Sequence, residues 1–408
     1  MQDGVLYARP LLQSLWNRKK QAGHRCNRYN FNESISFMER QIVIHQPQYV
    51  EIGAGSAAKA ADWAAEFKKI LILTSKSVAE LVPKLGLNPS IEIYENITAE
   101  PEDRVLHAAL EAAKRYQPDA IIGLGGGSVM DIAKLVCVMW AGRQQLEDII
   151  GPNKVSHRFS KLALIPTTAG TGSEAGIRAL VTNSETNAKM AVESPLMCAD
   201  LAILDPDLTL SVPPALTAVT GIDAMAHCVE AFTNIRAHSV VDGYARMGFD
   251  AVGKYLGRAV KDGADKSARA GMMLASYYGG ICLGPVNTAA GHALAYPLST
   301  NLKLPHGLAN ALIFPHVFGF NQPVCSYKTN EVLIALGETS ATDSQTAFEQ
   351  AYRFCQSLGI DMKLSSYGAK TEQLRGFAEE AHGIRRLMDN NPRDMSIEDI
   401  EQIYQTAF

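Results

Sequence analysis

Four side chains that could hold one metal ion lie between positions 221 and 306 of the chain. Asp223 and His227 are four residues apart in GIDAMAHCVEAF, a segment of helix-forming residues, and a helix places side chains with this spacing on one face. His292 and His306 follow in AAGHALAYPLSTNLKLPHG. One carboxylate and three imidazoles form a mixed nitrogen and oxygen set that suits divalent iron or zinc better than magnesium or calcium.

A metal site competes here with the ordinary roles of histidine. For any single histidine, a hydrogen-bonded core or surface position is the better interpretation. Two further histidines beside the Asp–His pair favour a metal site, although this spacing is less specific than a cysteine-rich zinc pattern. No Asp, Glu, Lys or Arg occurs between Arg269 and Lys303, so His292 is expected to lie among packed helices around a buried site.

Composition narrows the class of protein. The 408 residues are enough for two domains with a large core, and a net charge of −4 gives no reason to expect nucleic acid as a partner. Seven cysteines, an odd number without a CxxC pair, indicate reduced thiols and predict a cytoplasmic protein. The uncharged run contains Gly284, Pro285 and Pro297, a composition that argues against a membrane-spanning helix and a membrane partner.

Residues 1–36 are basic, with Asp3 and Glu33 as their only acidic residues. They lack the apolar core of a secretory signal, and a leader of this composition also fits an organelle transit peptide. We favour a poorly ordered extension, or a start codon placed upstream of the true one at Met38, and expect no part of the fold here.

Residues 37–206 alternate between β-rich and helical segments. Strands are expected at residues 49–53, 69–74 and 91–97 and in the runs AIIGLG, KLALIP, RALVTN and LAILDP. Helices are expected at residues 57–67 and 100–116 and in VMDIAKLVCVMWA. This alternation predicts an α/β domain with a parallel sheet and crossover helices.

Residues 207–408 change in character, because β-rich runs give way to helical segments. The expected helices are residues 215–233, 240–255, 266–278, 330–336, 345–358, 370–383 and 397–407. The second domain is therefore predicted to be all-α, with a boundary near Asp207.

Two loops could bind a dinucleotide. Gly125, Gly126 and Gly127 stand with Ser128 where a strand meets a helix, so backbone N–H groups and the helix dipole can face a phosphate. Because Ser128 stands where the dinucleotide fingerprint has its last glycine, a plain tight turn is an equally good interpretation of this loop alone. The second loop, residues 166–174, carries several hydroxyl groups. Two loops at the ends of neighbouring strands line the crevice where such sheets bind ligands, which favours a dinucleotide site.

Long motifs resemble the iron-containing, group III alcohol dehydrogenases. They are GGGSVMDIAK, PTTAGTGSE, ILDP, TGIDAMAHCVEAF and LPHGLANALIFPHV, and the resemblance extends over residues 37–408. It implies a fold similar to dehydroquinate synthase, with an α/β dinucleotide-binding domain (37–206), an all-α metal domain (207–408) and a site between them. By matching position, the metal ligands would be Asp223, His227, His292 and His306, and the cofactor would be lined by Gly125, Gly126, Gly127, Ser128, Asp131, Thr167, Thr168, Ser173 and Lys189.

The chain departs from the family pattern at three positions. Ser75 stands where many members have an aspartate that repels the 2′-phosphate of NADP, so NADP is expected to be accepted. Tyr296 stands where many members have a proton-relaying histidine. Arg178 occupies a position that faces the substrate in the family, and two interpretations stay open: a salt bridge to Glu174 or another carboxylate, or a contact with an anionic substrate. Strand alternation would place Arg178 and Leu180 on one face, interpreted as the interior or the cleft.

The sequence and the resemblance together predict a metal-dependent oxidoreductase that uses NAD or NADP. It would interconvert a small alcohol, anionic under the second interpretation of Arg178, and its aldehyde or ketone, with Fe²⁺ as the metal and Zn²⁺ as the alternative. Protons would leave through water, Tyr296 or the cofactor ribose. The alternatives are a hydroxyacid–oxoacid transhydrogenase, a maleylacetate reductase and a lyase of the dehydroquinate synthase kind. A homo-oligomer, a dimer, is expected.

Overall fold

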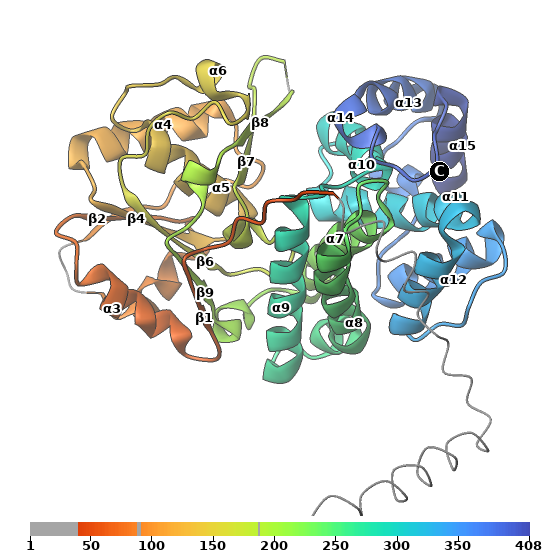
Figure 1. The fold of residues 1–408 in the computed structure, drawn as a ribbon, viewed down its shortest axis with the longest axis horizontal. Coiled ribbons are helices and arrows are strands. Elements are labelled where there is room, and N and C mark those ends of the chain that lie inside the picture. The colour runs from red at the N-terminus through yellow and green to blue at the C-terminus, as the bar shows by residue number, and fades with distance from the viewer. Residues whose placement is uncertain (1–39, 88–90, 187) are drawn as a thin grey trace, which may run out of the picture. The chain divides into compact units, whose positions relative to one another are not determined.

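A six-stranded parallel sheet organises the first half of the structure, a computed structural model that describes residues 40–87, 91–186 and 188–408 (Figure 1). The strand order is β1-β9-β6-β4-β2-β3, and each neighbouring pair is parallel. The predicted parallel α/β architecture is confirmed, whereas the predicted extension at residues 1–36 lies outside the described residues. The strands are β1 (Tyr49–Ile52), β2 (Ile70–Leu73), β3 (Ile91–Tyr94), β4 (Ala120–Gly125), β6 (Lys161–Pro166) and β9 (Leu201–Leu204).

Helices cover both faces of this sheet, which is why its central strands are almost continuous apolar runs. Leu71 and Leu73 of β2 pack in one core with residues of α4 (Asp103–Tyr116) and α5 (Gly127–Met139). Ile70 and Ile72 point to the other face and pack with residues of α3 (Lys59–Ala64). The helix expected at residues 57–67 is shorter than predicted, because it begins as a 3₁₀ turn at Ser56–Ala58 and ends at Ala64.

A second, three-stranded sheet lies outside the parallel one, in the order β5-β8-β7. It consists of β5 (Gly151–Pro152), β8 (Lys189–Glu193) and β7 (Arg178–Thr182), and β7 runs antiparallel to β8. Ala179 and Val181 form the buried face of β7, while Arg178 and Leu180 share the partly exposed face. The expectation that Arg178 and Leu180 share a face is thus correct, and since this face is partly exposed it is not the interior, which leaves the cleft as the other predicted location.

The second half of the chain is helical, and residues 206–408 contain no strand. Its central element is α7 (Pro214–Thr233), which is buried at every residue from 221 to 233 and packs in one core with α8, α9, α11 and α12. A helix that is apolar on all sides is a helix enclosed by others. The remaining helices are α8 (Ser239–Lys261), α9 (Lys266–Leu283), α10 (Ala290–Asn301), α11 (His306–Ala335), α12 (Ser344–Ser357), α13 (Leu374–Gly383), α14 (Arg385–Met388) and α15 (Ile397–Ala407).

Helix α11 is much longer than the segment at 330–336 that its sequence predicts. Pro315 and Pro323 lie inside it, and proline normally ends a helix because it removes a backbone donor. The chain continues through both prolines with a kink at Cys325, whose backbone is not helical (φ −138°, ψ 36°). The helix is buried around Pro315, whereas Pro323 and Val324 are exposed, and the kink follows Pro323 by two residues.

The loop that follows β6 packs directly on α9. Gly172 has φ +60°, and its N–H donates to Ser276 Oγ at 3.1 Å. A Cβ on Gly280 would overlap the carbonyl oxygen of Gly172 and lie 2.8 Å from its carbonyl carbon. Two glycines therefore allow the backbones of the loop and the helix to touch, and this contact joins the sheet-bearing half to the helical half.

We expect Gly280→Ala to lower the free energy of unfolding by about 1–3 kcal/mol, because the added methyl group would overlap the backbone of Gly172, which can move only if the loop shifts away from α9. The matched control is Gly257→Ala in α8, where a Cβ would meet no other atom within 4 Å. That change should raise stability by roughly 0.5–1 kcal/mol through helix propensity. Denaturant unfolding of both variants measures the difference, and equal effects would contradict a tight contact at Gly280.

Candidate metal centre and cofactor loops

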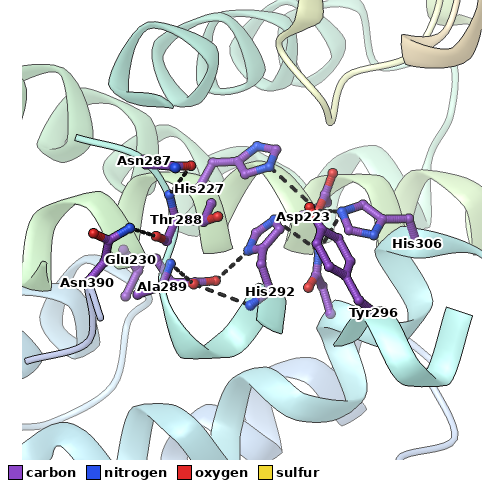
Figure 2. Close-up of polar contacts among 12 residues, drawn as sticks. Asp223, His227, Glu230, Asn287, Thr288, Ala289, His292, Tyr296, His306 and Asn390 are labelled. Atoms are coloured by element: carbon purple, nitrogen blue, oxygen red, sulfur yellow. Dashed lines mark hydrogen bonds and ion pairs between the residues drawn. The ribbon is translucent and has the colours of Figure 1, made fainter. Parts of the chain in front are cut away.

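Three helices bring the four predicted metal ligands together (Figure 2). Asp223 and His227 lie one turn apart on α7, His292 lies near the start of α10, and His306 is the first residue of α11. Asp223 Oδ1 lies 3.9 Å from His227 Nε2, 3.6 Å from His292 Nε2 and 3.7 Å from His306 Nε2. The ligand atoms of Asp223, His227 and His292 are all within 4.8 Å of one another. One oxygen and three nitrogens around one point fit a single divalent iron or zinc ion.

Burial and charge put most of this cluster in its ligating form. Asp223 is 2% exposed and His227 5%, whereas the side chain of His306 is 22% exposed, so the cluster is most open at His306. Burial favours a neutral carboxyl group, but the surrounding histidines outweigh it and hold the pKa of Asp223 far below its usual value. Burial lowers the pKa of His227 to about 4, which leaves its imidazole neutral. A carboxylate and a neutral imidazole are the forms that bind metal.

Glu230 orients one of the ligands and was not singled out by the sequence analysis. Its Oε1 lies 2.6 Å from His292 Nδ1, and its Oε2 accepts from the backbone N–H of Ala289 at 2.6 Å. A carboxylate on Nδ1 fixes the proton there and turns Nε2 toward the metal position. Glu230 lies three residues after His227 and seven after Asp223, so helical spacing within the same motif could have identified it.

Arg178 has a carboxylate partner, which is Glu193 on the neighbouring strand β8 and not Glu174. Its Nη2 lies 2.7 Å from Glu193 Oε2, and its Nη1 donates to Asn287 Oδ1 at 2.8 Å. Asn287 lies between α9 and α10, two residues before the Ala289 N–H that binds Glu230. The salt-bridge interpretation therefore describes the structure, and Arg178 also connects β7 to the loop that precedes His292.

Glu174, the carboxylate first considered for Arg178, is buried elsewhere. It is 1% exposed, and neither carboxylate oxygen is hydrogen-bonded to another residue in the described ranges. Burial raises the pKa of Glu174 to about 7. A substantial fraction of Glu174 is therefore protonated at neutral pH, and Glu174 neither pairs with Arg178 nor joins the metal ligands.

Tyr296 lies beside the most exposed ligand (Figure 2). Its ring centroid is 5.7 Å from that of His306, and its hydroxyl oxygen accepts from Arg386 Nη2 at 3.4 Å. The tyrosine thus stands between the open side of the ligand cluster and an exposed guanidinium group. This placement is compatible with the predicted role in proton exit.

The glycine turn lies at the end of β4, and it cannot accommodate side chains. A Cβ on Gly125 would lie 2.6 Å from Val129 Cγ2, and one on Gly127 would lie 2.6 Å from Thr171 Cγ2. At Gly126 the nearest atom would be Thr168 Oγ1, at 3.2 Å. The two predicted loops therefore touch, and the N-terminus of α5 with its free N–H groups lies in the turn between them.

Other residues assigned to the cofactor hold these loops in place. Asp131 Oδ1 accepts from Ser173 Oγ at 2.6 Å, and its Oδ2 accepts from the N–H of Leu180 at 3.0 Å. Lys134, fully buried, donates to the carbonyl oxygen of Ser173 at 2.6 Å and to that of Arg178 at 2.8 Å. These bonds join α5 to the second loop and to β7, so Asp131 and Ser173 have clear positioning roles.

The remaining assigned residues lie in or near the loops and on β8. Ser128 Oγ accepts from the N–H of Glu100 at 3.1 Å, and Lys189 forms an ion pair with Glu100. Thr167 is buried directly after β6. Ser75 follows β2, the strand next to β4, and its hydroxyl lies 3.1 Å from Ser77 Oγ.

The fold and the paired loops fit an enzyme with a dinucleotide-binding sheet and a separate helical metal centre, and comparison with known families shows which family the chain belongs to. The family model described as "Iron-containing alcohol dehydrogenase" matches residues 47–206. A second, "Fe-containing alcohol dehydrogenase family, C-terminal", matches residues 217–408. The chain belongs to the iron-containing alcohol dehydrogenase family and is an oxidoreductase, as its sequence motifs predict.

Individual relatives agree with this assignment. The chain is 35% identical to long-chain-alcohol dehydrogenase 1 of Geobacillus thermodenitrificans, over 78% of this chain and 82% of the relative. It is 32% identical to sulfoacetaldehyde reductase of Bilophila wadsworthia, over 87% of this chain and 96% of the relative. A crystal structure of 1,3-propanediol oxidoreductase superposes with a TM-score of 0.86 at 28% identity, covering 90% of this chain and 100% of that one. None of the helices in the described ranges is both long and apolar enough to cross a membrane.

We expect Glu230→Gln to weaken metal binding about 10- to 100-fold, since an amide NH₂ would face the N–H donors that the carboxylate now accepts. Glu331→Gln in α11 is the matched control, because Glu331 instead pairs with Arg246. Competition with a chelator for Zn²⁺ measures both affinities. An affinity of Glu230→Gln equal to that of the control would assign Glu230 a structural role only.

Proposed function

We propose that this protein is an iron-dependent, NAD(P)-linked dehydrogenase whose ion is held by Asp223, His227, His292 and His306. The observation that carries the proposal is the convergence of Asp223 Oδ1 and the three Nε2 atoms at separations of 3.6–3.9 Å. When bound, the ion would supply Lewis-acid polarisation of the substrate oxygen, and the nicotinamide cofactor would supply the hydride chemistry. Zn²⁺ is the alternative metal, since the donor set accommodates both.

The chain itself orients these groups and removes the proton. Glu230 fixes His292, and the contact of Arg178 with Asn287 holds the loop that carries the Glu230-binding N–H group. The hydroxyl of Tyr296, between His306 and Arg386, is placed to pass a proton from the open side of the cluster to water. The contacts of Tyr296 support the role in proton exit expected for it from the sequence, whereas the sequence analysis assigned no role to Glu230.

We also propose that NADP is accepted alongside NAD. The two glycine-lined loops provide the phosphate cradle, and Ser75 at the end of β2 carries no charge that would repel a 2′-phosphate. The first family match ends at residue 206 and the second begins at residue 217, which supports the predicted domain boundary near Asp207. A cytoplasmic homodimer stays a prediction, and native mass spectrometry would test its dimeric state.

An anaerobic screen of aldehydes and oxoacids with added Fe²⁺ tests the activity and its cofactor. We expect the wild-type chain to oxidise both NADH and NADPH with at least one small carbonyl substrate. Ser75→Asp should retain activity with NADH and weaken the binding of NADPH by about 1–3 kcal/mol, because an unpaired carboxylate would face the 2′-phosphate. No use of NADPH by the wild type at millimolar concentration would refute the cofactor proposal. Hydride exchange between two substrates with no free cofactor would instead identify a transhydrogenase.

The substrate class depends on whether Arg178 contacts the substrate in addition to forming its salt bridge with Glu193. Its side chain is 22% exposed on the partly open face of β7, and one relative is named for an anionic aldehyde, sulfoacetaldehyde. We propose that the substrate carries a carboxylate, sulfonate or phosphonate that shares the guanidinium group with Glu193.

Arg178→Met should then weaken transition-state binding of an anionic substrate by roughly 2–4 kcal/mol. A neutral alcohol of equal length is the control, and its turnover should stay the same or improve. Comparison of kcat/KM for the two substrates gives the result. Equal losses on both would assign Arg178 to the scaffold and point to plain aliphatic alcohols.

A further inference from the structure

The amide of Asn310 lies against three of the four proposed metal ligands. Asn310 is 2% exposed and sits on α11, one turn after His306. Its Nδ2 lies 2.6 Å from Asp223 Oδ1, 3.2 Å from His292 Nε2 and 3.2 Å from His306 Nε2. Its Oδ1 is buried and has no hydrogen-bond partner in the described ranges. One side of this amide therefore faces the ligand atoms, and the other has nothing to bind.

The inward nitrogen is incompatible with a metal ion at these ligand atoms. A neutral imidazole has one lone pair on its unprotonated nitrogen, so His292 Nε2 and His306 Nε2 cannot accept from an amide and bind an ion at once. Only Asp223 would keep lone pairs for Asn310. At least one N–H of the amide would then face a cation with no acceptor, in a buried setting where unpaired polar groups are costly.

A half-turn about the Cβ–Cγ bond of Asn310 would turn the N–H groups away from the ion, into the position where Oδ1 now lies. Amide nitrogen and oxygen have nearly the same size, so the rotation exchanges them with little repacking. It would place Oδ1, an uncharged oxygen donor of the kind that divalent iron accepts, beside Asp223, His292 and His306. The buried oxygen that now lacks a partner would become a donor to the ion.

We propose that Asn310 is a fifth donor of the metal centre, whose amide oxygen faces the bound ion. The inference rests on the proposed function, because it requires an ion at Asp223 and the three histidines. The proposal also predicts the side from which the substrate reaches the ion. Since Asn310 covers the face bounded by Asp223, His292 and His306, the substrate approaches from the more exposed side of His306, where Tyr296 lies.

The sign of the change in metal affinity tests this role. Asn310→Leu keeps the approximate shape and removes both polar atoms, and we expect Co²⁺ and Zn²⁺ to bind about 10- to 100-fold more weakly in chelator competition. If Asn310 only donates N–H bonds that compete with the ion, its removal would leave the affinity unchanged or tighten it, and the proposal would be overturned. Asn330→Leu is the matched control on the same helix, because Asn330 Oδ1 accepts instead from the N–H of Ala341.

The visible spectrum of the Co²⁺-loaded protein gives a second readout that does not depend on one variant folding. The proposal expects the weak bands of a five-coordinate ion in the wild type and the stronger bands of a four-coordinate ion in Asn310→Leu, or in Asn310→Ala if the leucine variant does not fold. A four-coordinate wild type, or the same five-coordinate spectrum in the variant, would overturn it. A wild type that binds no Co²⁺ would instead contradict the proposed function.

Discussion

An ionised carboxylate buried among imidazoles is the interaction on which this structure depends. Removing Asp223 from water is costly unless positive charge meets it, and the surrounding histidines supply that charge. Burial opposes the protonated form of His292, but Glu230 and Asp223 outweigh burial and raise the pKa of His292 to about 10. Helices α7, α10 and α11 each contribute at least one residue to this cluster (Figure 2). Glu230 then places a second buried carboxylate behind His292, which extends the polar network into the helical core.

The metal centre and the cofactor loops are connected by a short series of polar contacts. Lys134 and Asp131 tie α5 to the second loop and to β7. From β7, Arg178 reaches Asn287, and the backbone two residues further along binds Glu230. The glycine contact between Gly172 and α9 holds the same two regions at backbone distance. Asp131, Lys134 and Arg178 thereby link the second loop to the segment that precedes His292.

Local patterns account for the elements and residues that could be predicted. Parallel strands covered on both faces are apolar throughout, as in Ile70–Leu73, and the i, i+4 spacing of Asp223 and His227 is a helical property. The glycines before α5 indicate a tight turn by themselves, and only together with the second loop do they favour a dinucleotide site.

Long-range contacts explain what the sequence could not show. Glu193, the partner of Arg178, belongs to strand β8, whose mixed polar sequence gives no strand signal. Helix α11 continues through Pro315 in buried surroundings and kinks after Pro323, and Asn310 meets Asp223 only after α7 and α11 pack together. These features depend on which elements become neighbours, and local periodicity contains no information on that choice.

Titration of chelator-treated protein with Fe²⁺ under anaerobic conditions is the most direct test of the proposed metal centre. The rate of NAD(P)H oxidation with a responsive aldehyde should rise in proportion to added iron and reach its plateau at about one ion per chain, since the four ligands surround one point. The same titration of His306→Ala should give no activity at any iron concentration. Full turnover in the chelated wild type, or iron-independent activity in His306→Ala, would contradict a catalytic ion at Asp223 and the three histidines.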